Sequence, residues 1–229
     1  RRLQERVEEL FALYEISQAL SSVMGSDEQY GAILAVIARV MDARRVSLLM
    51  LDEKERVLKM KSALGIPAPV IDSIRVDITG DTISARAFRT GEAILTEDID
   101  THGRFGRNKR LRYTTPTFMV VPLKTQDNVF GILSVSEPTS GRQYSEDDMK
   151  LMVTVGGPIA ENYENLLLYR EVLEKNRIQK EVEIMRNIQQ RILPKSFPKY
   201  VGLDIAGASL PAKEVGGDFY DFIPIDERK

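Results

Sequence analysis

The sequence predicts an α+β fold, with about six strands in an antiparallel sheet, flanking helices, and long coiled-coil-like helices at both ends of the chain. Apolar residues recur with the period of a helix up to about residue 41 and again from residue 145. Between these stretches lie short apolar runs bounded by turn residues. Because short turns connect most of these runs, antiparallel pairing is expected, with the helices on one side of the sheet.

Residues 1–24 are expected to form a helix. Its apolar positions alternate at spacings of four and three residues, which is typical of a coiled coil. These positions are Leu3, Val7, Leu10 and Tyr14, and the stripe is widened by Phe11, Ile16 and Leu20. Gly25 and Ser26 interrupt the pattern, and Asp27 is suited to cap a second helix that reaches about Met41.

The middle of the chain holds the strand candidates and one short helix. The helix is expected between Gly80 and Gly91, with Asp81 or Thr82 as its N-cap and Gly91 as its stop. The six strands are expected at residues 45–52, 57–63, 74–78, 93–96, 117–123 and 129–136.

The longest helix is expected from residue 145 to about residue 193. Ser145 and Asp148 have the spacing of a capping box. Pro158 follows two glycines in the middle of the pattern and should kink or split this helix, because proline lacks a backbone donor. Beyond it, an apolar stripe continues among alternating charges at Ile178, Val182, Met185 and Ile192.

Composition excludes several classes of function. The chain has 229 residues and a formal net charge of −2, which gives no bulk attraction to nucleic acid or to an anionic membrane. It contains no cysteine, so disulfides, thiolate metal sites and cysteine nucleophiles are excluded. No apolar run approaches the ~20 residues of a membrane span. A cytoplasmic location is expected.

Four stretches, taken together, resemble the GAF domain. They are residues 42–52 (DARRVSLLMLD), 80–100 (GDTISARAFRTGEAILTEDID), 117–138 (TFMVVPLKTQDNVFGILSVSEP) and 144–169 (YSEDDMKLMVTVGGPIAENYENLLLY). The resemblance implies a GAF sensor domain over residues 25–160, preceded by an N-terminal signalling helix at residues 1–24.

The resemblance leaves the ligand of such a domain open. GAF domains that bind cyclic nucleotides carry an Asn-Lys…Phe…Asp-Glu motif. Here Asn108 and Lys109 precede Phe118, but no Asp-Glu pair follows, so cyclic-nucleotide binding is not expected. A pocket could bind a small molecule or a protein. Alternatively, aromatic side chains fill it and leave a structural dimerisation module; they are Phe88, Phe105, Tyr113 and Phe118.

A second resemblance covers residues 181–222 (EVEIMRNIQQRILPKSFPKYVGLDIAGASLPAKEVGGDFYDF). This stretch is similar to the opening of PPM-type serine/threonine phosphatases of the RsbU- and SpoIIE-like branch, in which a helix ending in Leu-Pro leads into two strands and a Val-Gly-Gly-Asp-Tyr-Tyr-Asp motif. The resemblance implies a helical coiled-coil linker at residues 161–193 and the first strands of a truncated PPM α/β-sandwich domain at residues 194–229.

This second resemblance also implies a metal site. It makes Asp218 one carboxylate ligand of a two-metal Mn²⁺ or Mg²⁺ centre, where hard cations take oxygen ligands. Gly216 and Gly217 would let the backbone approach that centre closely. The bland alternative is a glycine turn followed by an exposed aspartate. Because the family's remaining aspartates are not in this chain, the chain itself is expected to be inactive.

Two functional hypotheses follow. In the first, a GAF sensor controls a metal-dependent phosphatase that acts on a phosphoprotein such as an anti-sigma-factor antagonist, within a homodimer formed through the terminal helices. In the second, the chain is a non-enzymatic GAF module for ligand binding or dimerisation, with a degenerate phosphatase tail. Residues after Lys229 would discriminate between them.

The remaining candidate sites favour structural interpretations. His102 is the sole histidine and is expected to be a solvated loop residue rather than a ligand. A basic cluster could bind an anion, but a solvated loop is favoured; it comprises Arg104, Arg107, Lys109, Arg110 and Arg112. The segment 216–219 superficially resembles the diguanylate cyclase motif, but the required glutamate is absent, and we reject that interpretation.

Overall fold

The computed structural model describes residues 10–11, 13–19, 27–96, 117–126, 128–199, 201–202, 204–211 and 213–223. The chain divides into two compact units, Arg1–Leu167 and Leu168–Lys229. The boundary lies within one continuous helix, α5.

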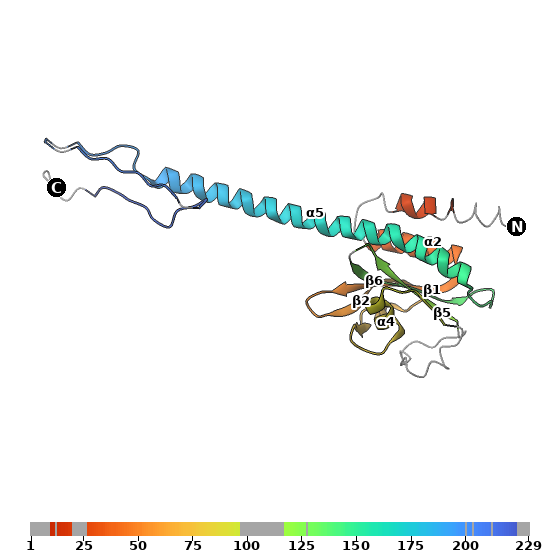
Figure 1. Ribbon diagram of the computed structural model, residues 1–229. Helices are drawn as coiled ribbons and strands as arrows, with labels where there is room; N and C mark the ends of the chain where they lie inside the picture. Colours follow the sequence, from red (N-terminus) through yellow and green to blue (C-terminus); the bar gives the residue numbers. More distant parts are fainter. Residues whose placement is uncertain are drawn as a thin grey trace. The chain divides into compact units, whose positions relative to one another are not determined.

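The first unit is built on an antiparallel six-stranded sheet, as predicted (Figure 1). The strand order is β3-β2-β1-β6-β5-β4, and every neighbouring pair is antiparallel. The strands are β1 (Ala43–Asp52), β2 (Val57–Leu64), β3 (Arg75–Asp77), β4 (Ile94–Thr96), β5 (Phe118–Lys124) and β6 (Val129–Pro138). All six predicted strands are confirmed, and their ends differ from the expected ones by a few residues at most.

The helices of this unit are α2 (Asp27–Val40), α3 (Ala68–Ile71), α4 (Ile83–Thr90) and the first part of α5 (Glu146–Ile192). The predicted caps of α4 are confirmed: Thr82 Oγ1 accepts from the Ala85 amide at 3.1 Å, and Gly91 has φ 65°, which glycine adopts without a Cβ penalty. The four-residue helix α3 was not predicted, because one turn is too short to show a period.

Helices cover both faces of the sheet, so the expectation of helices on one side is wrong. Figure 1 shows α2 and α5 over one face and α4 against the other. Along β1, Val46, Leu48 and Met50 belong to the core under α2 and α5, whereas Leu49 belongs to the core under α4. The physical reason is that strand residues with apolar side chains on both faces need cover on both faces.

In the described part of the N-terminal helix, residues 10–11 and 13–19, some residues of the apolar stripe are buried and others are exposed to solvent. Ile16 is 1% exposed and lies in the core with α2 and α5. Leu10, Phe11 and Tyr14 are exposed, Leu10 at 66%. The other stripe residues (Leu3, Val7 and Leu20) lie outside the described residues. The predicted stripe is therefore divided between core packing and an exposed apolar edge.

The long helix α5 starts as predicted. The Ser145 amide donates to Asp148 Oδ2 at 2.7 Å, and the Asp148 amide donates to Ser145 Oγ at 3.3 Å, which is a capping box. Of the two outcomes predicted at Pro158, a kink or a split, the split is wrong, because α5 is continuous from Glu146 to Ile192; the kink stays a prediction. Buried packing around this position offsets the lost backbone hydrogen bond, since Val155 and Ile159 lie in the core.

The second unit consists of the end of α5 and the chain that follows it. An aromatic cluster organises this chain: the Phe197 and Tyr220 rings stack at 6.5 Å, and Phe222 lies edge-on to Phe197 at 5.5 Å. The strands expected in residues 194–229 do not form among the described residues of that segment, which are turns and extended chain. A strand needs a neighbouring ladder, and the described part of this segment offers none. Its assignment to a phosphatase domain stays a prediction.

Candidate functional site

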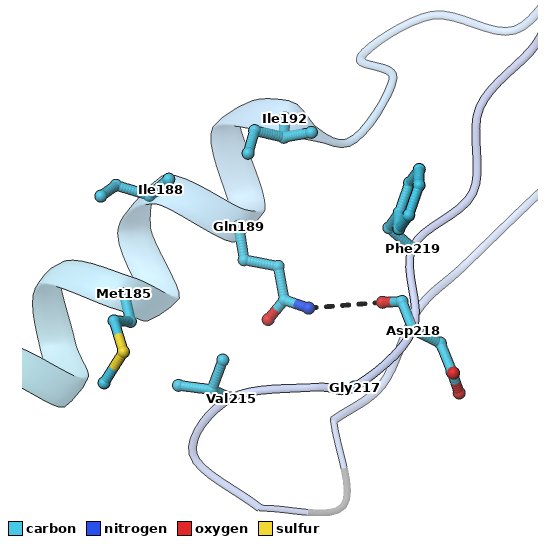
Figure 2. A pocket seen from close by; sticks show the side chains of 8 residues that line it. All are labelled: Met185, Ile188, Gln189, Ile192, Val215, Gly217, Asp218 and Phe219. Atoms are coloured by element: carbon cyan, nitrogen blue, oxygen red, sulfur yellow. Dashed lines mark hydrogen bonds between the residues drawn. The ribbon is translucent and has the colours of Figure 1, made fainter.

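The Gly-Gly-Asp segment lies against the last turns of α5 within the second unit (Figure 2). Asp218 is exposed, and Figure 2 shows its carboxylate pointing away from the helix. Only its backbone carbonyl faces α5. The structure therefore leaves the carboxylate oxygens accessible from solvent, as a metal ligand requires.

Gln189 joins α5 to this segment through its side-chain amide. Its Nε2 donates to the Gly216 carbonyl at 2.7 Å and to the Asp218 carbonyl at 3.3 Å. The Gly216 amide donates back to Gln189 Oε1 at 3.0 Å. The side chain thus satisfies a backbone donor and two backbone acceptors, as a strand neighbour would. We call these three hydrogen bonds the Gln189 clamp.

An apolar groove of about 530 Å³ surrounds the clamp. Besides Gln189, it is lined by Met185, Ile188, Ile192, Val215, Gly217, Asp218 and Phe219. Phe219 follows the candidate metal ligand directly and is 73% exposed. Apolar side chains of the helix and of the segment thus face one another across the groove, and the hydrogen bonds of the clamp join the two.

The two glycines of the motif differ in their surroundings. A Cβ on Gly216 would come within 3.2 Å of Gln189 Nε2 and 3.6 Å of Pro211 Cβ, whereas a Cβ on Gly217 would meet nothing within 4 Å. The close approach at Gly216 is thus to Gln189. The expectation that both glycines admit a metal centre stays a prediction.

Asp218 can supply one ligand of a metal centre, but it cannot form such a centre by itself. A free carboxylate is a ligand that Mg²⁺ and Mn²⁺ prefer. Among the described residues, however, no group of three or more histidine, cysteine, aspartate or glutamate side chains is placed to hold a metal ion. The described residues supply one candidate ligand, and a two-metal centre would need further carboxylates.

A second candidate site is the sheet face beneath α4. Thr96 Oγ1 and Ser134 Oγ are buried there and have no hydrogen-bond partner. Their strand partners, Phe118 and Val120, pack in the core of that face. Unpaired buried hydroxyls are costly, but these two have almost no solvent-accessible surface, so a ligand would reach them only after the side chains that cover them move.

Several residues singled out from the sequence lie outside the described residues. They are His102, the basic cluster at residues 104–112, and two of the four aromatic residues proposed to fill a pocket, Phe105 and Tyr113. The other two, Phe88 and Phe118, are half-buried against the core under α4. The structure thus supports a packing role for these two rings.

Sequence reasoning missed Gln189, although a signal was present. The apolar stripe at residues 178, 182, 185 and 192 follows spacings of four and three, and the missing member is position 189. A polar residue at the one vacant position of a heptad stripe indicates a specific contact rather than general packing.

Within the part of the chain that the structure describes, no helix combines the length and apolar character needed to cross a bilayer.

Comparison with known proteins identifies the first unit. Residues 26–161 match the family model described as GAF domain. The structure resembles the GAF domain of a phosphoenolpyruvate-protein phosphotransferase from Coxiella burnetii, with a TM-score of 0.65, 15% identity, and coverage of 72% of this chain and 98% of that one. It also resembles the corresponding Acinetobacter domain, with a TM-score of 0.60, 18% identity, and coverage of 68% and 92%.

Two curated relatives are regulatory or enzymatic proteins. The Nif-specific regulatory protein of Herbaspirillum seropedicae is 26% identical over 224 residues, which is 94% of this chain and 39% of that protein. Phosphoserine phosphatase RsbU of Bacillus subtilis (strain 168) is 41% identical over 49 residues, which is 21% of this chain and 15% of that protein. The matches therefore span well under half the length of either relative.

Proposed function

Because the chain belongs to the GAF domain family, we propose that its first unit is a signal sensor whose output is a metal-dependent protein serine/threonine phosphatase of the RsbU- and SpoIIE-like PPM branch. The GAF fold and the regulatory character of the relatives support a signalling role. The phosphatase output is the finer part of the proposal, and it rests on the tail.

One observation carries the phosphatase proposal. The helix α5, which contributes Met152, Val155 and Ile159 to the GAF core, also provides Gln189, which holds the backbone on both sides of Gly217. The Val-Gly-Gly-Asp-Phe-Tyr-Asp segment is thus attached to the same helix that leaves the sensor. The short match to RsbU supports this assignment.

Asp218 would be one ligand of the metal centre. Mn²⁺ or Mg²⁺, when bound, supplies an activated water and neutralises phosphate charge. The chain's own contribution is to present an accessible carboxylate on a backbone fixed by α5. The substrate class is a phosphoserine or phosphothreonine on a partner protein, such as an anti-sigma-factor antagonist, and the location is the cytoplasm.

The active form is a homodimer joined through the terminal helices. Exposed apolar side chains on these helices support this part of the proposal. On the N-terminal helix they are Leu10, Phe11 and Tyr14, and on the part of α5 between the GAF core and the groove they are Leu168, Tyr169, Val172, Leu173, Ile178 and Ile184. Exposed apolar stripes at helical spacing are suited to pairing with another helix.

The direct test is an activity measurement. A longer chain that adds the ~200 residues of a typical complete domain is assayed for Mn²⁺-dependent hydrolysis of p-nitrophenyl phosphate, with the 229-residue chain as the control. We expect hydrolysis by the longer chain alone, and its loss in Asp218→Asn with the oligomeric state unchanged. Full activity in Asp218→Asn would contradict the role of Asp218.

A non-enzymatic regulator is the second candidate. The match to a Nif-specific regulatory protein over 94% of this chain favours it. In that case the tail is a degenerate phosphatase segment, and the GAF unit serves ligand binding or dimerisation. Absence of Mn²⁺-dependent hydrolysis in a folded, dimeric longer chain would favour this candidate.

A further inference from the structure

Gln189 occupies an unusual place on α5. From Leu168 to Ile192, every residue of the helix is exposed except Val182 and Gln189, which are half-buried. Val182 belongs to the apolar stripe, whereas Gln189 is polar and makes three hydrogen bonds to the backbone of the Gly-Gly-Asp segment. The one polar member of the stripe is thus the one that hydrogen-bonds to this segment.

The clamp acts on the backbone immediately around Asp218. Nε2 of Gln189 donates to the carbonyls of Gly216 and Asp218, so the chain is fixed on both sides of Gly217. Figure 2 shows the bond to the Asp218 carbonyl. A glycine held at neither side would have wide conformational freedom, and the direction of the next side chain would vary. With both neighbours held, the Asp218 carboxylate points to the side away from the helix.

We propose that Gln189 is a positioning residue, through which α5 fixes the direction of the Asp218 carboxylate toward the metal centre. This rests on the proposed phosphatase function. Residues that orient a metal ligand typically change metal affinity 10–100-fold when they are removed. Gln189 contacts no metal ligand side chain and acts only through the backbone.

The same contact couples the ligand to the linker. Met185, Gln189 and Ile192 are successive members of the stripe with spacings of four and three, and all three line the groove whose other wall is the segment at residues 215–219. Successive residues of a helix are about 100° apart around its axis, so a rotation of that size replaces Gln189 by a neighbour. Such a rotation breaks all three hydrogen bonds and releases Asp218 from its fixed direction.

The first experiment tests the hydrogen bonds of the Gln189 clamp directly and does not depend on enzymatic activity. Amide hydrogen exchange at Gly216 is followed by NMR in the ¹⁵N-labelled 229-residue chain and in Gln189→Ala, Gln189→Glu and Gln190→Ala. Gln190 is exposed and serves as the matched control. We expect exchange about 10-fold faster or more in Gln189→Ala and no change in Gln190→Ala. Gln189→Glu replaces the donor Nε2 by a carboxylate oxygen that faces the Gly216 and Asp218 carbonyl oxygens, so repulsion is expected to speed exchange at Gly216 at least as much as in Gln189→Ala.

The second experiment measures metal binding in the longer chain described above. Free Mn²⁺ is quantified by electron paramagnetic resonance, and the half-saturating Mn²⁺ concentration for hydrolysis is measured in parallel. We expect Gln189→Ala to raise the Mn²⁺ dissociation constant about 10-fold with an unchanged melting temperature, and Gln190→Ala to match the wild type.

The outcomes separate the two proposals. Equal Gly216 exchange in the wild type and Gln189→Ala overturns the clamp, and unchanged Mn²⁺ affinity in Gln189→Ala overturns its positioning role. Either result leaves the phosphatase function standing if the wild type hydrolyses its substrate. Absence of Mn²⁺ binding and hydrolysis in the wild type overturns the phosphatase function and, with it, the role of Gln189 toward a metal.

Discussion

Replacing Pro158 by alanine should stabilise the first unit. Proline inside a helix costs about 3 kcal/mol relative to alanine, because it lacks a donor and its ring crowds the carbonyl of the preceding turn. Here that carbonyl belongs to Thr154. Pro158 is half-buried, so alanine gives up part of the apolar burial of the ring, roughly 1 kcal/mol. The net gain expected for Pro158→Ala is about 1–2 kcal/mol.

The measurement is thermal unfolding of the 229-residue chain followed by circular dichroism. For a chain of this size, a gain of about 1–2 kcal/mol raises Tm by roughly 2–8 °C. Pro69→Ala is the control: Pro69 lies in the first turn of α3, where proline is tolerated, and no gain is expected there. A lower Tm for Pro158→Ala would refute the reasoning, because it would show that the ring's packing outweighs the missing hydrogen bond.

For three further substitutions the structure predicts whether folding stability rises or falls. Gly131→Ala should lower the free energy of unfolding by about 3 kcal/mol or more, because a Cβ there would overlap the Leu49 carbonyl oxygen of the neighbouring strand. Urea unfolding measures this loss, and an unchanged urea midpoint would contradict the close approach of the two strands at Gly131. Gly31→Ala, in α2 with open space around the added methyl group, should raise the urea midpoint, by about 0.5–1 kcal/mol in stability. Hydrogen bonds from Ser140 and Thr139 lower the pKa of Asp42 to about 2. The Asp42 carboxylate therefore contributes fully to folding stability above pH 3.8, and this stabilisation is lost as the pH falls toward 2. Asp42→Asn, which tolerates the positive φ of 53°, should therefore be less stable than the wild type at pH 7, and the difference should shrink between about pH 4 and pH 2; a pH-independent difference would exclude the carboxylate as its cause.

The fold was largely predictable because its signals are local. The capping pair at Ser145 and Asp148 and the stop at Gly91 each depend on residues a few positions apart, and the structure confirms both. That helices cover both faces of the sheet could have been predicted from the sequence. Residues 119–123 of β5 contain no polar side chain, whereas a strand with one face in water would alternate apolar and polar residues, and all five are buried in the structure.

The remaining differences arise from contacts between distant residues. Whether Pro158 breaks α5 depends on packing against the sheet, where Gly156 would bring a Cβ to 3.4 Å from Val121 Cγ1. Local propensity contains no information on that support. Likewise, Gln189 and Gly216 are 27 positions apart, and only the fold of the second unit brings them together. The motif therefore singles out Asp218 as a candidate ligand but contains no signal for Gln189, which hydrogen-bonds to its backbone carbonyl.

The exposure of α5 beyond Leu168 has a thermodynamic consequence. Almost every side chain there faces solvent, and a helix without tertiary contacts is only marginally stable in water, because its backbone entropy nearly balances its hydrogen bonds. The helical content of this segment is therefore a population that temperature, salt or a bound partner can shift. A partner that orders it contributes directly to forming the turn that carries Gln189. The strength of a signal through this chain would then be set by how much helix is formed, as well as by how the helix is oriented.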